Sequence, residues 1–301
     1  MNKKKISFLR HYHGYTGGHQ KVRDYLAHFI NLDWTPTLFL SNKAKTNTNL
    51  FSDLDNVVYE QKYQPEAADV AFLAGMDWQY YLPKRQPNQP VINLIQHVRH
   101  ADPSEQLFKF LQEPAIRLCV SQAVTDAISP YANGPCHTIR MGHRFPSIQS
   151  PIKREIYILA SKQPELGNEL ASWATELGYR TLCHTSTQEK KDVMMSMASS
   201  RLTVALPHKT EGFFLPGIEA MYYSKMAVVP ECVANKEYYS RFANIVMPKY
   251  TKQDIQLAIK SALNQPLSMT KMRSYMGKRI AKSYSLENER KELKQHLSYY
   301  F

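Results

Sequence analysis

The most informative segment of the chain is 207–221, which reads PHKTEGFFLPGIEAM. A predicted strand ends before it, and Pro216 stands where the first residue of a helix is expected. The backbone N–H groups of 213–217 would then converge at a helix N-terminus, which binds an anion such as a diphosphate without a metal. Glu211 can accept hydrogen bonds from sugar hydroxyls, and Glu219 can bind a ribose diol. The alternative interpretation is an ordinary strand–turn–helix unit in which both glutamates are solvated and bind no ligand.

Short runs of β-branched and aromatic residues alternate with helical patterns along the chain. We expect the strands and helices that they form to position segment 207–221. In the first series, strands are predicted at 6–12, 37–40, 57–59, 70–73, 91–95 and 116–120, and helices at 17–30 and 122–128. In the second series, strands are predicted at 155–160, 179–183, 202–206 and 227–229, and helices at 165–177, 188–199 and 216–223. Few polar residues interrupt the strands, which is typical of parallel strands covered on both faces. The sequence therefore predicts an α/β fold of two Rossmann-like, doubly wound domains that face a central cleft.

Beyond Thr251 the pattern is helical only. One stripe consists of Met269, Met272, Met276 and Ile280, and we expect it to pack against the core. Lysine and arginine occupy much of the remaining surface of this helix, which favours a solvated face with a modest attraction for anionic lipid. Ser285 is predicted to cap the last helix.

The chain has 301 residues, with 38 Lys and Arg against 26 Asp and Glu, and its formal charge is +12. This excess indicates an anionic partner, which could be nucleic acid, a phosphorylated substrate or a membrane surface. The charge is uneven, because 249–301 holds 11 basic and 4 acidic residues, and this argues against a nucleic-acid-binding protein. No apolar run approaches the ~20 residues of a membrane-spanning helix. The apolar run within residues 1–10 is too short for the hydrophobic region of a signal peptide. Four widely spaced cysteines favour a reducing compartment. We therefore expect a cytoplasmic protein that contacts the inner membrane face peripherally through its basic C-terminal region.

Segment 207–221 resembles the E-x7-E signature of the retaining GT-B glycosyltransferases of family GT4, the group 1 glycosyltransferases. Glu211 and Glu219 have the spacing of that signature. Other segments resemble the same family in the same order along the chain: Thr16-Gly17-Gly18-His19, Asn93-Leu94-Ile95-Gln96-His97, Cys119-Val120-Ser121, Ile139-Arg140-Met141-Gly142 and Tyr284-Ser285-Leu286-Glu287. The resemblance therefore covers most of the chain.

The resemblance implies a GT-B architecture and an activity. It predicts an acceptor-side domain at 1–143, a nucleotide-sugar donor domain at 144–283, and a C-terminal helix at 284–301 that crosses back to the first domain. The implied reaction moves a sugar from a nucleotide-sugar to a glycan, glycolipid or glycoprotein acceptor with retained anomeric configuration. It needs no metal and no cofactor beyond the donor substrate. A nucleic-acid partner is not expected.

The resemblance also assigns residues to roles. His97 and Glu211 would be the catalytic pair, with His97 touching the donor sugar or orienting the acceptor. His19 and Arg99 would lie on the acceptor side. The donor would be bound by Gly17, Gly18, Lys162, Lys209, Gly212, Phe213, Phe214, Leu215 and Glu219.

Two departures from the family pattern leave other functions open. Phe214 stands where the family has a glycine that lets the donor phosphate approach closely. Ser161 and Leu166 stand where the family has an arginine and a lysine that clamp the diphosphate, so Lys162 or Lys209 would have to take over. The alternatives are a degenerate GT-B protein that binds a nucleotide or glycan without turnover, and a GT-B nucleotide-sugar epimerase.

Other polar clusters have weaker interpretations. His11, His13 and His19 could hold a metal, but contact with substrate or an ordinary surface position is favoured, because no cysteine or carboxylate stands close to them. Asp53-Leu54-Asp55 matches the metal-binding Asp-x-Asp of another transferase class, and we interpret it as a loop. Arg99 and His100 fit either a reader of an anionic acceptor or a solvated surface pair.

Overall fold

The computed structural model describes residues 3–12, 14, 16–40, 50–54, 58–60, 62–233 and 235–301. The chain forms two compact units. Unit 1 comprises Met1–Arg140 with Glu289–Phe301, and unit 2 comprises Met141–Asn288. The chain therefore passes between units after residues 140 and 288, whereas the sequence placed these divisions after 143 and 283.

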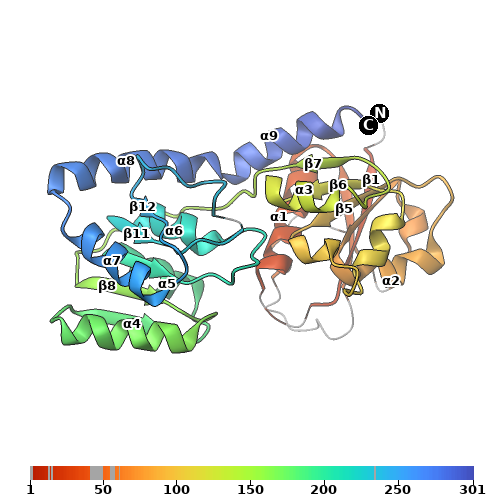
Figure 1. Ribbon diagram of the computed structural model, residues 1–301. Coiled ribbons are helices and arrows are strands. Elements are labelled where there is room, and N and C mark those ends of the chain that lie inside the picture. Colours follow the sequence, from red (N-terminus) through yellow and green to blue (C-terminus); the bar gives the residue numbers. More distant parts are fainter. Residues whose placement is uncertain are drawn as a thin grey trace. The chain divides into compact units, whose positions relative to one another are not determined.

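Unit 1 is built on a parallel sheet, which in the described residues has the strand order β3-β2-β1-β4-β5-β6-β7 (Figure 1). The strands are β1 Lys5–Arg10, β2 Thr35–Leu40, β3 Val58–Glu60, β4 Val70–Ala74, β5 Val91–Ile95, β6 Ile116–Cys119 and β7 Cys136–Thr138. The helices of this unit are α1 Gly17–Asn31, α2 Trp78–Tyr81, α3 Gln122–Ile128 and most of α9, Leu286–Leu297. Short 3-10 turns lie at η2 Pro65–Ala67, η3 Gly75–Asp77, η4 Leu82–Lys84, η5 Val98–Ala101 and η6 Phe108–Gln112.

The sheet of unit 1 holds its register through apolar contacts at its centre. Phe8 in β1 stands beside Leu38 in β2 and Phe72 in β4. The rings of Phe8 and Phe72 stack with their centroids 4.5 Å apart. Side chains on both faces of β1 are buried, and these include the polar Ser7 and Arg10.

Unit 2 is built on a second parallel sheet, with the order β12-β11-β10-β8-β9 in the described residues (Figure 1). Its strands are β8 Arg154–Leu159, β9 Thr181–His184, β10 Ser200–Ala205, β11 Met226–Val228 and β12 Ile245–Val246. Its helices are α4 Pro164–Glu176, α5 Lys190–Ala198, α6 Leu215–Tyr223, α7 Lys252–Leu263 and α8 Leu267–Ser283. Helices α4 and α7 contact the sheet over one apolar core that includes Ile158, Leu170, Val204 and Ile259. Helices α5 and α6 also contact the sheet, and α8 packs on α6.

The predicted fold class is confirmed, since both units are Rossmann-like parallel sheets with helices. Ser121 caps α3 as predicted, because its hydroxyl accepts the N–H of Val124 at 3.3 Å. Strands β7 and β12 were not predicted from the sequence. Both strands are short edge strands, and their neighbours β6 and β11 supply the pairing that their own sequences do not indicate. No helix in the described part of the chain has the length and apolarity needed to cross a membrane.

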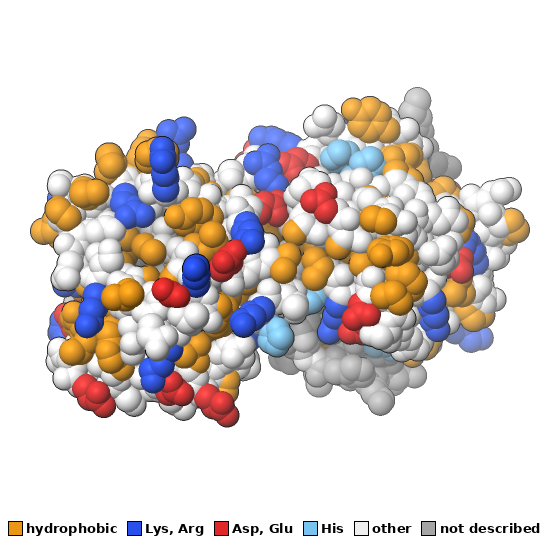
Figure 2. Space-filling model, in the orientation of Figure 1, with side chains coloured by type: hydrophobic (Ala, Val, Ile, Leu, Met, Phe, Trp, Pro, Cys, Tyr) orange, Lys and Arg blue, Asp and Glu red, His pale blue; other side chains and the backbone are white. Residues whose placement is uncertain are grey.

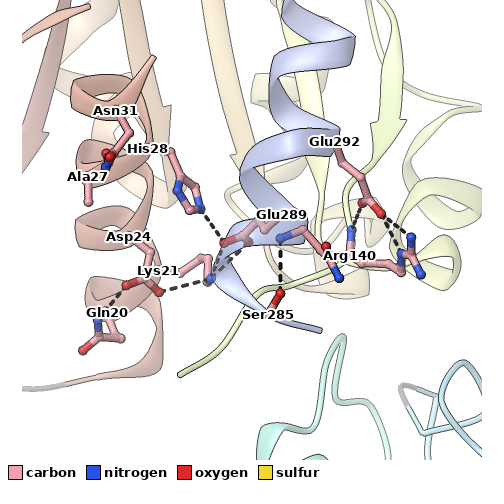
Figure 3. A network of polar contacts seen from close by, with 11 residues as sticks. Gln20, Lys21, Asp24, Ala27, His28, Asn31, Arg140, Ser285, Glu289 and Glu292 are labelled. Carbon is pink, nitrogen blue, oxygen red and sulfur yellow. Dashed lines mark hydrogen bonds and ion pairs between the residues drawn. The ribbon is translucent and has the colours of Figure 1, made fainter. Parts of the chain in front are cut away.

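A buried ionic network attaches the C-terminal helix to α1 within unit 1 (Figure 3). Glu289 in α9 is 1% exposed and accepts hydrogen bonds from Lys21 at 2.9 and 3.0 Å and pairs with the His28 ring at 2.8 Å. Asp24 lies 3.1 Å from the same Lys21 ammonium. Burial alone would raise the pKa of Glu289, but the charges and hydrogen bonds of Lys21 and His28 outweigh burial, so this pKa is lowered. On the next turn of α9, Glu292 bonds the backbone and side chain of Arg140.

We expect Glu289→Gln to destabilise unit 1 by about 3–5 kcal/mol, because the substitution removes the carboxylate that pairs with both Lys21 and His28 and leaves the buried Lys21 ammonium with Asp24 as its charged partner. Urea unfolding followed by fluorescence in a Trp173→Phe background measures this, since Trp34 and Trp78 then remain as probes and both lie in unit 1. The pKa of Glu289 is lowered in the folded state, so its contribution is complete above its ordinary pKa of 4.5 and is lost as the pH falls below that value. The variant should therefore lose less stability in acid than the wild type.

Asp33→Asn is the matched control. It removes a carboxylate from an ion pair with Lys3 in which both side chains are exposed, so the cost should stay below about 1 kcal/mol. Asp33 has φ 65°, a conformation that asparagine also adopts. Equal unfolding midpoints for the Glu289 and Asp33 variants would contradict the role given to the network.

Candidate functional site

The centre of the unit 2 sheet is a topological switch point. Strands β8 and β10 are neighbours there, and the chain continues from them to opposite sides, toward β9 and toward β11. Parallel strands end at one common edge, and ligands of open α/β sheets bind outside that edge at such a switch point. Lys162 follows β8 and Glu211 follows β10, so both predicted donor-site residues stand at this position.

Lys162 and Glu211 form an ion pair between the Lys162 ammonium and the Glu211 Oε1 atom. The lysine side chain is about half exposed, whereas the Glu211 carboxylate is mostly buried. The Lys162 ammonium also lies 5.5 Å from the centroid of the Phe214 ring, within the range of a cation–π contact. The structure thus brings together three residues that the sequence assigned to one site.

Phe214 immediately precedes α6 and lies beside Lys162. Its φ of −106° is open to any residue, so the backbone does not require glycine there. Its ring is buried, with 2% of the residue exposed, and serves as a platform for Lys162. Phe213 and Gly212 are also buried, and Leu215 is half-buried.

The N-terminus of α6 is fixed by close packing against Tyr238. The Tyr238 hydroxyl donates a 3.1 Å hydrogen bond to the carbonyl of Phe214, which precedes the helix. A Cβ atom on Gly217 would lie only 2.2 Å from that hydroxyl, so only glycine fits at this turn. Pro216 is the second residue of α6, one position later in the helix than predicted, and it lies in the first turn. Pro216 has no N–H group, and the N–H of Gly217 donates to the Phe214 carbonyl at 3.1 Å. The packing against Tyr238 fixes the direction of the helix N-terminus, whose partial positive charge favours an anion.

Glu219 lies on the second turn of α6 and is buried with His143. Its Oε1 atom is 2.7 Å from the His143 Nε2 atom and 3.9 Å from the Lys190 ammonium. Burial would raise the pKa of Glu219, but the bond from His143 and the charges of His143 and Lys190 lower it. The backbone N–H of His143 donates to the carbonyl of Tyr284 at 2.8 Å. This hydrogen bond fixes the backbone from which the imidazole side chain extends.

Sequence reasoning missed His143 and Lys190. Lys190 begins α5 and His143 directly follows the Ile139-Arg140-Met141-Gly142 segment, and neither shares a motif with Glu219. The sequence gives one signal for them: each is a polar residue next to a predicted segment boundary in unit 2.

The other residues considered for the cationic clamp, Lys209, Ser161 and Leu166, do not have the position of Lys162. Lys209 is exposed, and its ammonium lies 5.5 Å from the Tyr250 ring centroid. Leu166 packs against the apolar core of unit 2, while Ser161 is exposed. Of the two lysines proposed to replace the family's clamp, Lys162 is therefore the one that pairs with Glu211.

Unit 1 brings the other predicted site residues to one edge of its own sheet. Gly17 and Gly18 begin α1 after β1, and a Cβ on Gly18 would lie 3.7 Å from the side-chain amide of Gln96, which follows β5. Thr16 caps α1 by accepting the N–H of His19 at 3.1 Å. A Cβ on Gly17 would meet no atom within 4 Å, so the backbone of this turn is open to a ligand.

His97 follows Gln96 at the same edge and has a defined tautomer. Its Nδ1 atom accepts the N–H of Arg99 at 3.1 Å, so the neutral ring carries its proton on Nε2. Arg99 is exposed. His100 is buried, and burial together with the charges of Arg99 and His97 lowers its pKa to about 4. Arg99 and His100 are therefore not a solvated surface pair, and only Arg99 can meet an acceptor.

The remaining polar clusters do not form a site in the described residues. The Asp53 carboxylate is 2.7 Å from the Arg23 guanidinium, and Asp55 and His13 lie outside the described residues. The His19 ring packs edge-on against Tyr12. Within the described part of the chain, no three His, Cys, Asp or Glu side chains come together as metal ligands would.

The two Rossmann-like units together have the GT-B fold. Sucrose-phosphate synthase from Thermosynechococcus elongatus is similar over 98% of this chain and 98% of its own, with a TM-score of 0.75 and 12% identity. Anabaena Alr3699/HepE in complex with UDP-glucose is similar over 98% and 99%, with a TM-score of 0.69 and 14% identity. The pneumococcal O-GlcNAc transferase GtfA in complex with UDP and GlcNAc is similar over 99% of both chains, with a TM-score of 0.64 and 8% identity. No family model and no curated protein matches the sequence. At these identities the likeness shows the fold.

We expect His143→Ala to destabilise unit 2 by about 3–5 kcal/mol at neutral pH, because Glu219 keeps its burial and loses its 2.7 Å partner. The pKa of Glu219 should rise in this variant, so the variant should gain stability as the pH falls toward 5 while the wild type does not. Thermal unfolding at pH 8 and pH 5 (about three units apart, wide enough to span the titration) measures both effects. His208→Ala removes an exposed histidine of the same unit and should leave the melting temperature unchanged. A His143→Ala variant that melts like the wild type at both pH values would contradict the assignment.

Proposed function

We propose that this protein is a metal-independent, retaining glycosyltransferase that uses a nucleotide-sugar donor. The observation that carries the proposal is the Lys162–Glu211 pair at the switch point of unit 2, beside the fixed N-terminus of α6. A cation, a sugar-binding carboxylate and a helix N-terminus are the groups that a sugar linked to a diphosphate needs. The GT-B likeness supports the proposal, since HepE and GtfA were each crystallised with a uridine nucleotide.

In the proposed donor complex, Lys162 and Glu211 bind different parts of the donor. The diphosphate takes Lys162 and the N–H groups at the start of α6, while Glu211 accepts hydroxyls of the donor sugar. Glu219, held by His143, accepts the ribose hydroxyls. Because Lys162 and the helix dipole face the leaving diphosphate, they stabilise the negative charge that develops on it, which is commonly the largest contribution to catalysis.

The proposed transfer balances without a separate base. The bond between the sugar C1 and the diphosphate oxygen breaks, and the acceptor hydroxyl oxygen bonds to C1 on the same face. The acceptor proton passes to the departing phosphate oxygen. His97, protonated on Nε2, donates a hydrogen bond to the donor sugar or orients the acceptor, and Gly17 and Gly18 let the backbone approach the phosphates. The acceptor is a glycan, glycolipid or glycoprotein, with His19 and Arg99 on its side.

A second candidate is a GT-B protein that binds a nucleotide or glycan without turnover. The observation that favours it is that one of the two clamp positions holds a core residue, Leu166, so a single lysine is left beside Glu211. Thermal shift combined with nucleotide release, over UDP-, GDP- and ADP-sugars and varied acceptors, separates the two candidates. Binding without release supports the second candidate, and release with an altered free sugar indicates an epimerase.

We expect Lys162→Met to weaken donor binding about 10- to 100-fold, because a hydrogen bond to a charged group is worth about 1.5–3 kcal/mol. Lys209→Met is the matched control and should change donor affinity by less than about twofold, since its ammonium lies against Tyr250. Isothermal titration with the preferred nucleotide-sugar measures both variants. If Lys209→Met is the variant that loses affinity, the clamp has been assigned to the wrong lysine. Glu211→Ala with unchanged donor use would remove the whole site assignment.

Turnover should be unaffected by a chelator, because the site stabilises the leaving diphosphate with Lys162 and backbone dipoles. The measurement compares nucleotide release before and after dialysis against EDTA, with and without added Mg²⁺. The anomeric configuration of the product, read by NMR, tests retention. Activity that disappears with the chelator and returns with Mg²⁺ would overturn the metal-independent mechanism, and an inverted product would overturn retention.

A further inference from the structure

Helix α8 turns its large apolar side chains outward. Leu267 is 75% exposed, Met272 59% and Tyr275 63%. The prediction that the methionine stripe packs against the core is wrong for Met272 and also for Met269, which is exposed.

The inward face of α8 is made of small residues, and this explains the orientation of the helix. Gly277 and Ala281 are buried. A Cβ on Gly277 would lie 1.8 Å from the Asn244 side chain and 2.7 Å from Met221 in α6. Helix α8 therefore packs so closely on α6 that no large side chain fits between them. Met269, Met272 and Tyr275 are consequently left on the outer surface, whereas Met276 and Ile280 are half-buried.

The same outer surface is strongly basic. Helix α8 contains five lysines and arginines and no acidic residue. Lys271, Lys278, Arg279 and Lys282 are exposed, and no carboxylate in the described part of the chain forms an ion pair with them. Figure 2 shows basic and hydrophobic side chains side by side over α8, at the upper left of the molecule.

An apolar groove of about 510 Å³ runs beside α8, a volume in the range of small-molecule binding sites. Its apolar walls include Ile152, Met226, Leu263 and Leu267. Its cations are Arg201, Lys225, Lys271 and Lys278, and none of the described residues that line it is acidic. The groove thus repeats the chemistry of the helix surface, with apolar walls and cations around them.

We propose that the outer surface of α8 and its groove form a docking site for a bilayer of anionic phospholipid. Leu267, Met272 and Tyr275 enter the boundary between headgroups and acyl chains, as the apolar side of an interfacial helix does. Lys271, Lys278 and Lys282 extend along that apolar surface and place their ammonium groups at the anionic headgroups. The groove accommodates part of an acyl chain beneath the cationic rim.

Charge decides between a membrane and a second copy of this chain. In a two-fold dimer the same surface meets itself, so the cations of α8 and of the groove rim would face one another without an acidic partner. An anionic bilayer offers the complementary charge to all of them at once, with about a fivefold gain in partitioning for each lysine or arginine near the surface. The proposal does not depend on the catalytic function, because none of these residues belongs to the donor site.

Flotation of the full chain with lipid vesicles tests the proposal. One set of vesicles is pure phosphatidylcholine, and the other contains about 30% phosphatidylglycerol. Partitioning into the anionic vesicles should exceed that into the neutral vesicles at least about tenfold, and it should fall as salt is added. Equal partitioning into both sets, or no binding to either, would overturn the proposal.

Two pairs of variants separate this surface from a general effect of basic charge. Lys271→Glu with Lys278→Glu should lower partitioning at least about tenfold. Lys191→Glu with Lys294→Glu makes the same change in net charge at exposed positions of α5 and α9, and it should change partitioning by less than about threefold. Equal losses in the two variants would overturn the assignment to α8.

The apolar contribution is tested by Leu267→Ser with Met272→Ser, against Leu177→Ser, an exposed leucine at the end of α4. The α8 variant should partition about tenfold less, and the control should match the wild type. Unchanged melting temperature and donor-induced thermal shift show that each variant is folded. Light scattering of the wild type tests the other occupant. A concentration-dependent dimer that the α8 serine variant abolishes would overturn the proposal in favour of a second copy.

Discussion

Moving a carboxylate out of water costs several kcal/mol unless charged partners replace its hydration, and both units of this chain contain buried carboxylates that have such partners. Glu289 in unit 1 is held by His28 and Lys21, and Glu219 in unit 2 is held by His143 with Lys190 nearby. In both cases the pKa stays below its ordinary value despite burial. The partners come from distant parts of the sequence, so each pair fixes one element against another. Glu289 attaches α9 to α1, and Glu219 attaches α6 to the segment at His143.

The proposed donor site follows from a second constraint, the geometry of parallel sheets. Because all strands of unit 2 end at one edge, residues that follow β8 and β10 meet there although they are far apart in sequence. Lys162 and Glu211 meet in this way. Phe214 contributes its buried ring as support for Lys162, so the residue that departs from the family's glycine is also the one that positions the substitute cation. Tyr238 and Gly217 then fix the helix end beside this pair.

Close packing of small residues decides which surface of unit 2 is left for other contacts. Gly277 and Ala281 bring α8 against α6, and the larger apolar residues of α8 are left outside among lysines and arginines. A helix whose hydrophobic stripe faced the core would have shown the opposite exposure. Periodicity alone could not separate these arrangements, because a stripe of methionines and a stripe of small residues are both apolar in sequence.

The sequence by itself determined the two series of strands and helices, the parallel sheets and the position of the 207–221 segment. These features depend on local patterns: β-branched runs, a cap at Ser121 and a proline at the start of α6. The choice between Lys162 and Lys209, the burial of His100 and the partnership of His143 with Glu219 were decided only by the tertiary structure. The same holds for the short edge strands β7 and β12 and for the outward face of α8. Each depends on a contact between residues far apart in the chain, and such a contact leaves no periodic or local signal that a single sequence can display.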